Sequence, residues 1–405
     1  MGNRINLVDC LAITVLLAVV SMYLLLFEAE LEIPDGLPIL THNALRYAGD
    51  DGTAENESSM IPLRGNPEQH FQDAPICQPL EYHDVTFSLA IALREENISM
   101  VTDHCKRWGV SAPISIAVWT YSSPEEVMKQ LNECHPEQMT IATLIPSNGL
   151  SSVETYPLNT LRNLAIQGIK TTHAIYLDIK MLTSIDLFDT LHAPPIVREL
   201  ARNPRLAVVL PAFEVITERC SFRGDCLENI PTTFDGLVMQ LSEKTTSIMA
   251  SHDKALQGST RYRTWVNQAN GELVDIQCVA SDYYEPFLAF RYCRGLPPFQ
   301  EVLSRQINYI RENAEGSNED TEHDRMSTWI IHLLRLGYAF KQVGGGFVVH
   351  LPNVVASNSI TRQLRKKKVQ QKFERNDFLE WLHRTIPDHR TMQRCSDILV
   401  DGDLA

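Results

Sequence analysis

The sequence predicts an α/β fold in which helices cover a mostly parallel mixed sheet, preceded by one transmembrane helix. Two observations carry this prediction. Short apolar runs alternate with helix-like segments between residues 85 and 210, and strands that alternate with helices form largely parallel sheets. Residues 10–27 form an almost uninterrupted apolar stretch, close to the roughly 20 residues needed to cross a bilayer. The 405-residue chain is 44% hydrophobic and can bury a substantial core.

The amino-terminal part predicts a single-pass type II membrane protein. Arg4 precedes the apolar stretch and acidic residues follow it, which predicts a cytosolic tail over 1–9, a signal anchor over 10–27 and a lumenal body. A cleaved signal peptide is the alternative, but no small-x-small cleavage site follows. Residues 28–80 are rich in Pro, Gly and acidic residues, so they are predicted to form a stem before a folded domain over 81–405.

Local residue patterns predict the strands and helices of the domain. Apolar runs bounded by Pro, Gly or polar residues predict strands at 85–93, 114–119, 140–145, 174–177, 206–210 with an extension past Pro211 to 215, and 347–350. Helical patterns occupy 99–108, 157–167 and 327–336, and one more helix begins near 124. That helix has a clear start signal, because Ser123 can cap it, Pro124 suits its first turn, and two acids follow.

Charge and cysteine content narrow the class of protein. The formal net charge of −14 argues against a nucleic-acid binder, which needs a basic footprint. Nine cysteines less Cys10 leave eight, enough for up to four disulfides in an oxidising compartment. Cys220 and Cys226 bracket a loop that a local disulfide could close, whereas a zinc site is disfavoured because no Cys-x-x-Cys pair is present. Sequons at Asn56 and Asn97 indicate a glycoprotein exposed to the lumen.

Asp178 is the residue that points most directly to chemistry. It ends the strand predicted at 174–177, and open α/β sheets bind ligands at the carboxyl ends of their strands. Far along the chain, His350 ends the last predicted strand. We expect the two side chains to converge on one pocket.

Four segments connect these residues to a known family. They are Tyr156-Pro157-x-Asn159-x-x-Arg162-Asn163, Leu210-Pro211-Ala212-Phe213-Glu214, Tyr284-Glu285-Pro286-Phe287 and Val349-His350-Leu351-Pro352. In this order and spacing they resemble the LARGE / β-1,4-glucuronyltransferase family of metal-dependent glycosyltransferases, over roughly residues 84–353. The resemblance implies a GT-A-like, Rossmann-related domain in the Golgi lumen. It also implies a UDP-sugar donor, carrying glucuronic acid or another sugar, and a glycan or glycoprotein acceptor.

The resemblance also implies roles for particular residues. Asn159 and Arg162 would lie near the nucleotide of the donor, and Asp178 and His350 would bind Mn²⁺. Family members invert the anomeric carbon, which requires a carboxylate to accept the proton of the acceptor hydroxyl. Glu285 is the candidate for this catalytic base, and Asp282 is the next.

Lys180 is the main departure from the family. The family has Asp-x-Asp, whereas this chain has Asp178-Ile179-Lys180, and a positive charge there should lower Mn²⁺ affinity. Two interpretations remain open: the ammonium binds the donor diphosphate in place of part of the metal's charge, or the site is inactive. The stretch after Pro297 also lacks the family's Phe-x-Gly-x-Gly motif. The alternative function is therefore an inactive homologue that binds a glycan or forms a complex with another glycosyltransferase.

Overall fold

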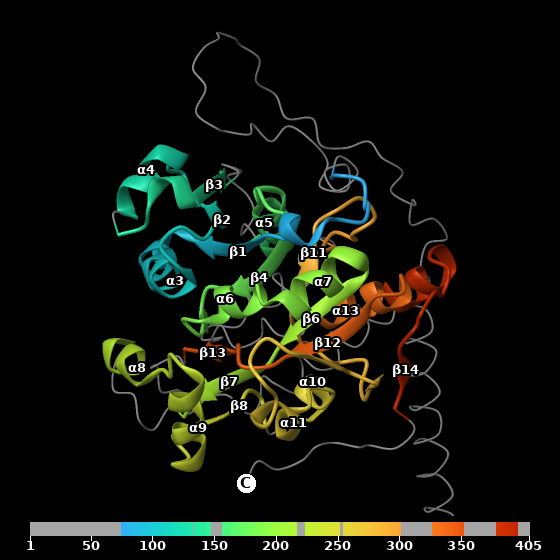
Figure 1. The fold of residues 1–405 in the computed structure, drawn as a ribbon. Helices are drawn as coiled ribbons and strands as arrows, with labels where there is room; N and C mark the ends of the chain where they lie inside the picture. Colours follow the sequence, from blue (N-terminus) through green and yellow to red (C-terminus); the bar gives the residue numbers. More distant parts are fainter. Residues whose placement is uncertain are drawn as a thin grey trace, which may run out of the picture. The chain divides into compact units, whose positions relative to one another are not determined.

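The structure is a computed structural model that describes residues 74–131, 133–146, 156–216, 223–251, 254–300, 326–351 and 378–395 (Figure 1). All of them belong to one compact unit, Ser58–Ala405. The predicted tail, membrane segment and most of the stem lie outside the described residues, as do Asn56 and Cys220. None of the helices within the described ranges combines the length and the apolar character that crossing a bilayer requires.

Among the described residues, eight strands form the larger sheet, in the order β3-β2-β1-β4-β11-β6-β12-β9. Their bounds are β1 Phe87–Arg94, β2 Ile114–Trp119, β3 Met139–Leu144, β4 His173–Asp178, β6 Leu206–Leu210, β9 Leu273–Asp275, β11 Phe287–Arg291 and β12 Ala339–Val343. The pairs β1–β2, β2–β3, β1–β4 and β6–β12 are parallel. Strand β11 runs antiparallel to both β4 and β6. This mixed α/β architecture fits the expected GT-A-like class.

The described α-helices are α3 Val101–Trp108, α4 Pro124–Gln130, α5 Leu158–Gln167, α6 Leu187–Leu191, α7 Pro194–Arg202, α8 Arg223–Asn229, α9 Phe234–Ser242, α10 Lys254–Gln257, α11 Tyr262–Val266 and α13 Met326–Arg335. Residues of α3 and α7 belong to the buried cluster on one face of the large sheet, and residues of α5 and α13 to the cluster on the other face. Short 3₁₀ helices occupy Tyr82–Asp84, Glu95–Met100 and Pro136–Gln138. The start signal of α4 is confirmed, because Ser123 and Glu126 form a capping box at its amino end.

A smaller sheet has the order β5-β13-β7-β8, and β10 pairs with β14 elsewhere. The bounds are β5 Met181–Thr183, β7 Ala212–Val215, β8 Thr246–Ile248, β10 Cys278–Val279, β13 Val348–His350 and β14 Gln393–Arg394. The expectation that one strand continues past Pro211 is wrong, since β6 lies in the large sheet and β7 in the small one. Proline has no N–H to donate to a ladder, and the chain changes sheet there.

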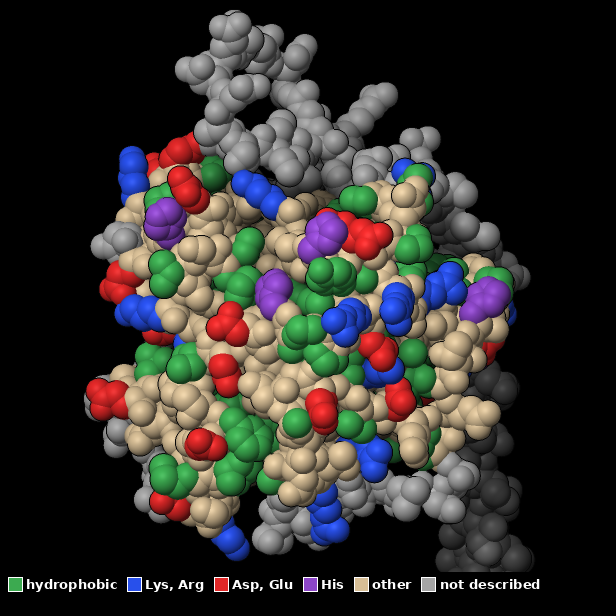
Figure 2. Space-filling view, viewed as in Figure 1, with side chains coloured by type: hydrophobic (Ala, Val, Ile, Leu, Met, Phe, Trp, Pro, Cys, Tyr) green, Lys and Arg blue, Asp and Glu red, His purple; other side chains and the backbone are tan. Residues whose placement is uncertain are grey.

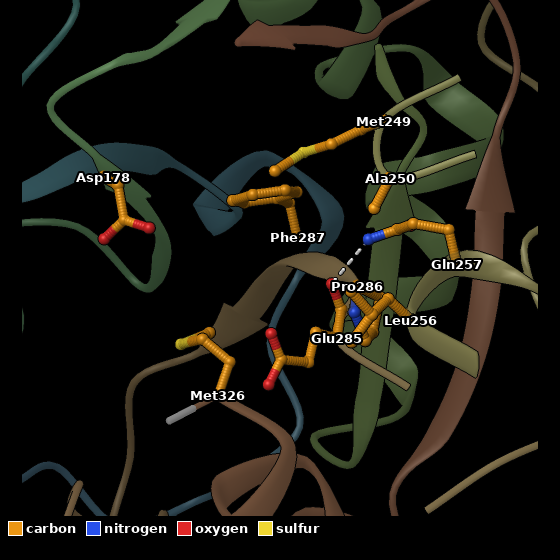
Figure 3. A pocket seen from close by; sticks show the side chains of 9 residues that line it. All are labelled: Asp178, Met249, Ala250, Leu256, Gln257, Glu285, Pro286, Phe287 and Met326. Carbon is orange, nitrogen blue, oxygen red and sulfur yellow. Dashed lines mark hydrogen bonds between the residues drawn. The ribbon is translucent and has the colours of Figure 1, made fainter. Parts of the chain in front are cut away.

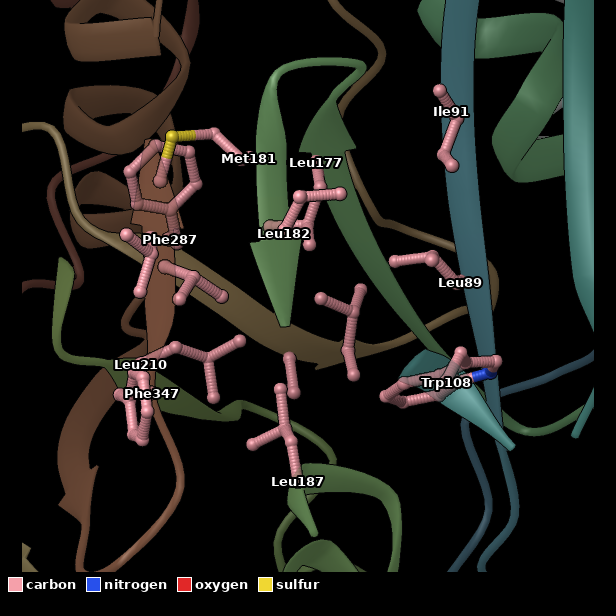
Figure 4. Packing of buried hydrophobic residues seen from close by; sticks show 14 of the residues in the cluster. Leu89, Ile91, Trp108, Leu177, Met181, Leu182, Leu187, Leu210, Phe287 and Phe347 are labelled. Atoms are coloured by element: carbon pink, nitrogen blue, oxygen red, sulfur yellow. The ribbon is translucent and has the colours of Figure 1, made fainter. Parts of the chain in front are cut away.

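The core follows the alternation of the strands. Leu89 and Ile91 of β1 face one buried cluster, which also receives residues of α3, α6 and α7 (Figure 4). Ala90 and Ala92 of the same strand face a second cluster, which contains residues of α5 and α13. Successive side chains of a strand point to opposite faces, so β1 is buried on both sides.

Three disulfides connect distant parts of the described chain: Cys77–Cys293, Cys105–Cys134 and Cys278–Cys395. Cys77 lies in the predicted stem, and Leu80 N also donates to Ala201 O at 3.0 Å. Residues 74–80 therefore belong to the folded domain rather than to a stem. On the face shown in Figure 2, acidic and basic side chains are interspersed.

Candidate active site

Asp178 ends β4 at the carboxyl edge of the large sheet, where Ala92 of β1 is its neighbour in the register. Its side chain is 13% exposed. The Tyr176 hydroxyl donates to Asp178 Oδ1 at 2.9 Å, and Arg162 Nη2 donates to the same oxygen at 3.4 Å. Two neighbours therefore hold one oxygen of this carboxylate.

Arg162 lies on α5 and is completely buried. Its Nε donates to the Tyr176 hydroxyl at 2.9 Å and its Nη1 to Asn159 Oδ1 at 3.1 Å. Asn159 in turn donates to Gln300 O at 2.9 Å. A buried guanidinium needs such partners, because an unpaired charge in the interior is costly. Asn159 and Arg162, which were predicted to lie near the nucleotide, are therefore both buried, and Asn159 is only 2% exposed. This burial favours a role in positioning Asp178.

The turn after Asp178 is anchored through its backbone on two sides. Ile179 O is 2.9 Å from His104 Nε2, and Lys180 O accepts from Leu351 N at 2.8 Å. Because a carbonyl oxygen only accepts, His104 Nε2 carries the hydrogen of this bond. Burial lowers the pKa of His104 to about 4, which keeps the ring neutral at pH 7. Lys180 itself is half-buried.

His350 lies next to this turn in the small sheet. In the register of that sheet, His350 on β13 is opposite Met181 on β5 and Glu214 on β7. Segments that are far apart in the sequence therefore meet near the end of β4, while the convergence of the Asp178 and His350 side chains on one pocket stays a prediction. Glu214 is half-buried, and its Oε1 accepts a long hydrogen bond from Ser247 Oγ at 3.5 Å.

Glu214 was not predicted as a site residue from the sequence. It is only the last residue of one of the family segments, Leu210–Glu214. Its place beside His350 depends on the parallel pairing of β7 with β13, which brings together residues more than a hundred positions apart. Local patterns do not specify such a pairing.

One pocket joins two of the predicted site residues, Asp178 and Glu285. Its lining consists of Asp178, Met249, Ala250, Leu256, Gln257, Glu285, Pro286, Phe287 and Met326. Figure 3 shows Asp178 on one side of the pocket and Glu285 with Gln257 on the other. Lys180 and His350 are not among the lining residues.

Glu285 is held tightly at this pocket and is 6% exposed. Its Oε1 accepts from Ser327 N at 3.0 Å, in the first turn of α13, and its carbonyl oxygen accepts from Gln257 Nε2 at 2.8 Å. A carboxylate interacts favourably with a helix N-terminus, so Glu285 also has a structural role. Asp282 differs, because its Oδ2 pairs with Arg394 Nη2 at 2.6 Å and it does not line the pocket.

These residues do not fit a resident Mn²⁺ ion. The described part of the chain contains no group of three or more His, Cys, Asp or Glu side chains able to hold a metal, whereas such ions take several oxygen or nitrogen ligands. Asp178 already accepts hydrogen bonds from Tyr176 and Arg162, and residue 180, where the resemblance implies a second acid, is a lysine. We therefore assign no step to a metal.

An α/β domain with an acid at the carboxyl end of a parallel strand, beside a pocket lined by two carboxylates, has the arrangement expected of a nucleotide-sugar transferase. The chain belongs to the family described as "Glycosyl-transferase for dystroglycan", whose sequence model matches residues 122–387. That match covers more than half of the 405 residues. It confirms the resemblance drawn from the motifs.

Several known proteins are similar to parts of the chain. Over 146 residues it is 31% identical to mouse "Xylosyl- and glucuronyltransferase LARGE2", covering 36% of this chain and 20% of the relative. Over 145 residues it is 30% identical to human "Xylosyl- and glucuronyltransferase LARGE1", covering 34% and 18%. The chain thus matches about a fifth of the length of these relatives.

Among solved structures, GalNAc-T7 with UDP, GalNAc and Mn²⁺ has a TM-score of 0.38 at 12% identity, over 72% of this chain and 48% of that one. The mannosyltransferase PcManGT from Pyrobaculum calidifontis, in complex with GDP-Man and Mn²⁺, has a TM-score of 0.32 at 10% identity, over 78% and 70%.

Proposed function

We propose that the protein is an inverting glycosyltransferase that moves a sugar from a UDP-sugar donor to a glycan or glycoprotein acceptor. The observation that carries this proposal is the pocket shared by Asp178 and Glu285, in a chain of this family. The relatives are named as xylosyl- and glucuronyltransferases, so glucuronic acid is the first donor sugar to test. The proposed location is the Golgi membrane, with residues 10–27 as the single anchor.

The reaction requires a base beside the acceptor hydroxyl that attacks the anomeric carbon of the donor sugar. The acceptor hydroxyl oxygen forms a bond to that carbon while the bond to the diphosphate breaks, and the electron pair leaves with the diphosphate. The acceptor proton passes to a carboxylate. Glu285 is the proposed base because it lines the pocket and its position is fixed by Ser327 and Gln257. Asp282 is the weaker candidate because it is paired with Arg394.

Asp178 has a separate proposed role. A carboxylate at the rim of the pocket can accept hydrogen bonds from donor hydroxyl groups. Arg162 and Tyr176 hold its Oδ1 in place from behind, and Asn159 orients Arg162. In this scheme Arg162 and Asn159 act on the donor through Asp178.

The test is transfer activity of the full chain with a panel of UDP-sugars and glycan acceptors, measured as UDP release and as labelled product. Glu285→Gln retains an oxygen that can accept from Ser327 N but cannot take up a proton in the same way. It should lower kcat by about 10²-fold or more. Glu272→Gln, at an exposed position, should keep wild-type activity. Full activity in Glu285→Gln would exclude Glu285 as the base.

A second candidate function is that of an inactive homologue that binds a glycan or a partner transferase. One observation favours it: a metal-ligand cluster is missing from the described residues. It predicts that the full chain binds members of a glycan array while releasing no UDP from any donor. Turnover of one UDP-sugar with an acceptor would exclude it.

A further inference from the structure

We infer that Lys180 binds the diphosphate of the donor directly, so that the nucleotide binds without a divalent cation. This inference rests on the proposed function, because it takes the pocket at Asp178 to be a nucleotide-sugar site. The ligand class is a nucleoside diphosphate. In this view the ammonium of Lys180 neutralises the phosphate charge, whereas a metal ion held by two acids would do so in the family.

The carboxylate of Asp178 already has a cationic partner. In a metal site its negative charge would be available to a cation. Here the buried guanidinium of Arg162 lies 3.4 Å from Oδ1 and offsets that charge, and the Tyr176 hydroxyl bonds to the same oxygen. Both partners belong to the core, because Arg162 is fully buried and Tyr176 is 2% exposed. The acid is therefore a poor anchor for a divalent ion.

The side chain two residues after Asp178 carries a positive charge. Residue 180 is a lysine, where the family resemblance implies a carboxylate. A cation there repels a metal ion and attracts phosphate, and lysine binds phosphate as a compact point charge. The same substitution thus removes one mode of diphosphate binding and supplies another.

The turn that carries Lys180 is anchored on two sides. Hydrogen bonds from His104 to Ile179 O and from Leu351 N to Lys180 O hold the turn at the end of β4. Lys180 is therefore attached to a well-anchored backbone two residues after Asp178, and the residue is half-buried. A cation in such a place loses less of its attraction to solvent screening than one on a mobile loop.

The experiment is calorimetric titration of the full chain with UDP, once in EDTA and once in excess Mn²⁺. We expect dissociation constants that agree within about twofold in the two conditions. Lys180→Ala should weaken binding in EDTA by about tenfold or more, the effect of losing a charge-assisted contact. The matched control is Lys170→Ala, an exposed lysine ahead of the amino end of β4, which should bind like wild type.

A further variant reverses the substitution. Lys180→Asp recreates the family's acidic pair, so it should lose UDP binding in EDTA and recover part of it when Mn²⁺ is added. Thermal unfolding of each variant confirms that it is folded before its affinity is interpreted. This variant separates a specific charge effect from general damage to the turn.

The outcomes distinguish the inference from the proposed function. UDP binding by wild type that EDTA abolishes and Mn²⁺ restores would overturn the inference and leave the transferase intact. Metal-independent binding that Lys180→Ala does not weaken would also overturn it. Metal-independent binding through Lys180 without sugar transfer would support the inference and overturn the proposed function. Failure of folded wild type to bind UDP in both conditions would overturn both.

Discussion

Replacing Arg162 with methionine should destabilise the domain by about 3–5 kcal/mol, the usual cost of breaking a buried ion pair from one side. The side chain is fully buried, and its guanidinium donates to Tyr176, Asn159 and Asp178. Methionine fills a similar volume but donates no hydrogen bond. It leaves three acceptors without this donor, and Asp178, at 13% exposure, is only partly able to recover the loss through water.

A double-mutant cycle tests whether this cost comes from the pair. Asp178→Asn also leaves a buried charge uncompensated, whereas the combined variant removes both charges. We therefore expect the double variant to be more stable than the sum of the single losses predicts, by about 1 kcal/mol or more. Arg162→Lys keeps the charge but loses the planar fork, so its loss should fall between wild type and Arg162→Met.

The assay is urea unfolding followed by tryptophan fluorescence at pH 7. Arg198→Met is the matched control, because Arg198 is exposed on α7, and it should lie within about 0.5 kcal/mol of wild type. A loss below about 1 kcal/mol in Arg162→Met, together with simple additivity in the cycle, would refute the paired network.

Three further predictions concern stability. Burial lowers the pKa of His104 from 6.5 to about 4, so the unfolded chain binds more protons between these values. Stability should therefore fall as pH drops from 6.5 towards 4, and His104→Gln should show a shallower fall in melting temperature between pH 7 and pH 5. Removing the Cys278–Cys395 disulfide by a double alanine substitution should cost about 2–4 kcal/mol in urea unfolding. Gly168→Ala places a Cβ 2.4 Å from Ser115 Oγ, which should cost about 1–3 kcal/mol, and adding Ser115→Ala should restore part of the loss.

The strands of the first half were predictable because their causes are local. Each is an apolar run bounded by a breaker, and β2 was predicted with the bounds that the structure has, Ile114–Trp119. The change of sheet at Pro211 and the antiparallel insertion of β11 between β4 and β6 were not predicted. Both depend on pairings between distant segments, which a single sequence does not encode in a local pattern.

The residues of the candidate site also differ in whether a local sequence pattern predicts their place. The position of Asp178 at a strand end could be predicted from the run before it. Without the family resemblance, Arg162 would pass for an ordinary surface arginine of a helix, whereas it is the most enclosed charge of the site. Its partners come from α5 itself and from β4. Likewise, the bond from Ser327 N to Glu285 joins segments 42 residues apart, and no local signal marks it.

The turn at residues 179 and 180 is anchored independently of the charge at position 180. A lysine can therefore stand there, where the resemblance implies an acid, without loss of the fold. The turn is held through the carbonyl groups of Ile179 and Lys180, and Asp178 is held from the core by Arg162 and Tyr176. These bonds are made by backbone groups of residues 179 and 180, so they are compatible with an acid or a lysine at position 180. If Lys180 binds the diphosphate as inferred, the fold is preserved and only the chemistry at this turn differs. For this reason nucleotide affinity in EDTA, rather than stability, is the measurement that reports on Lys180.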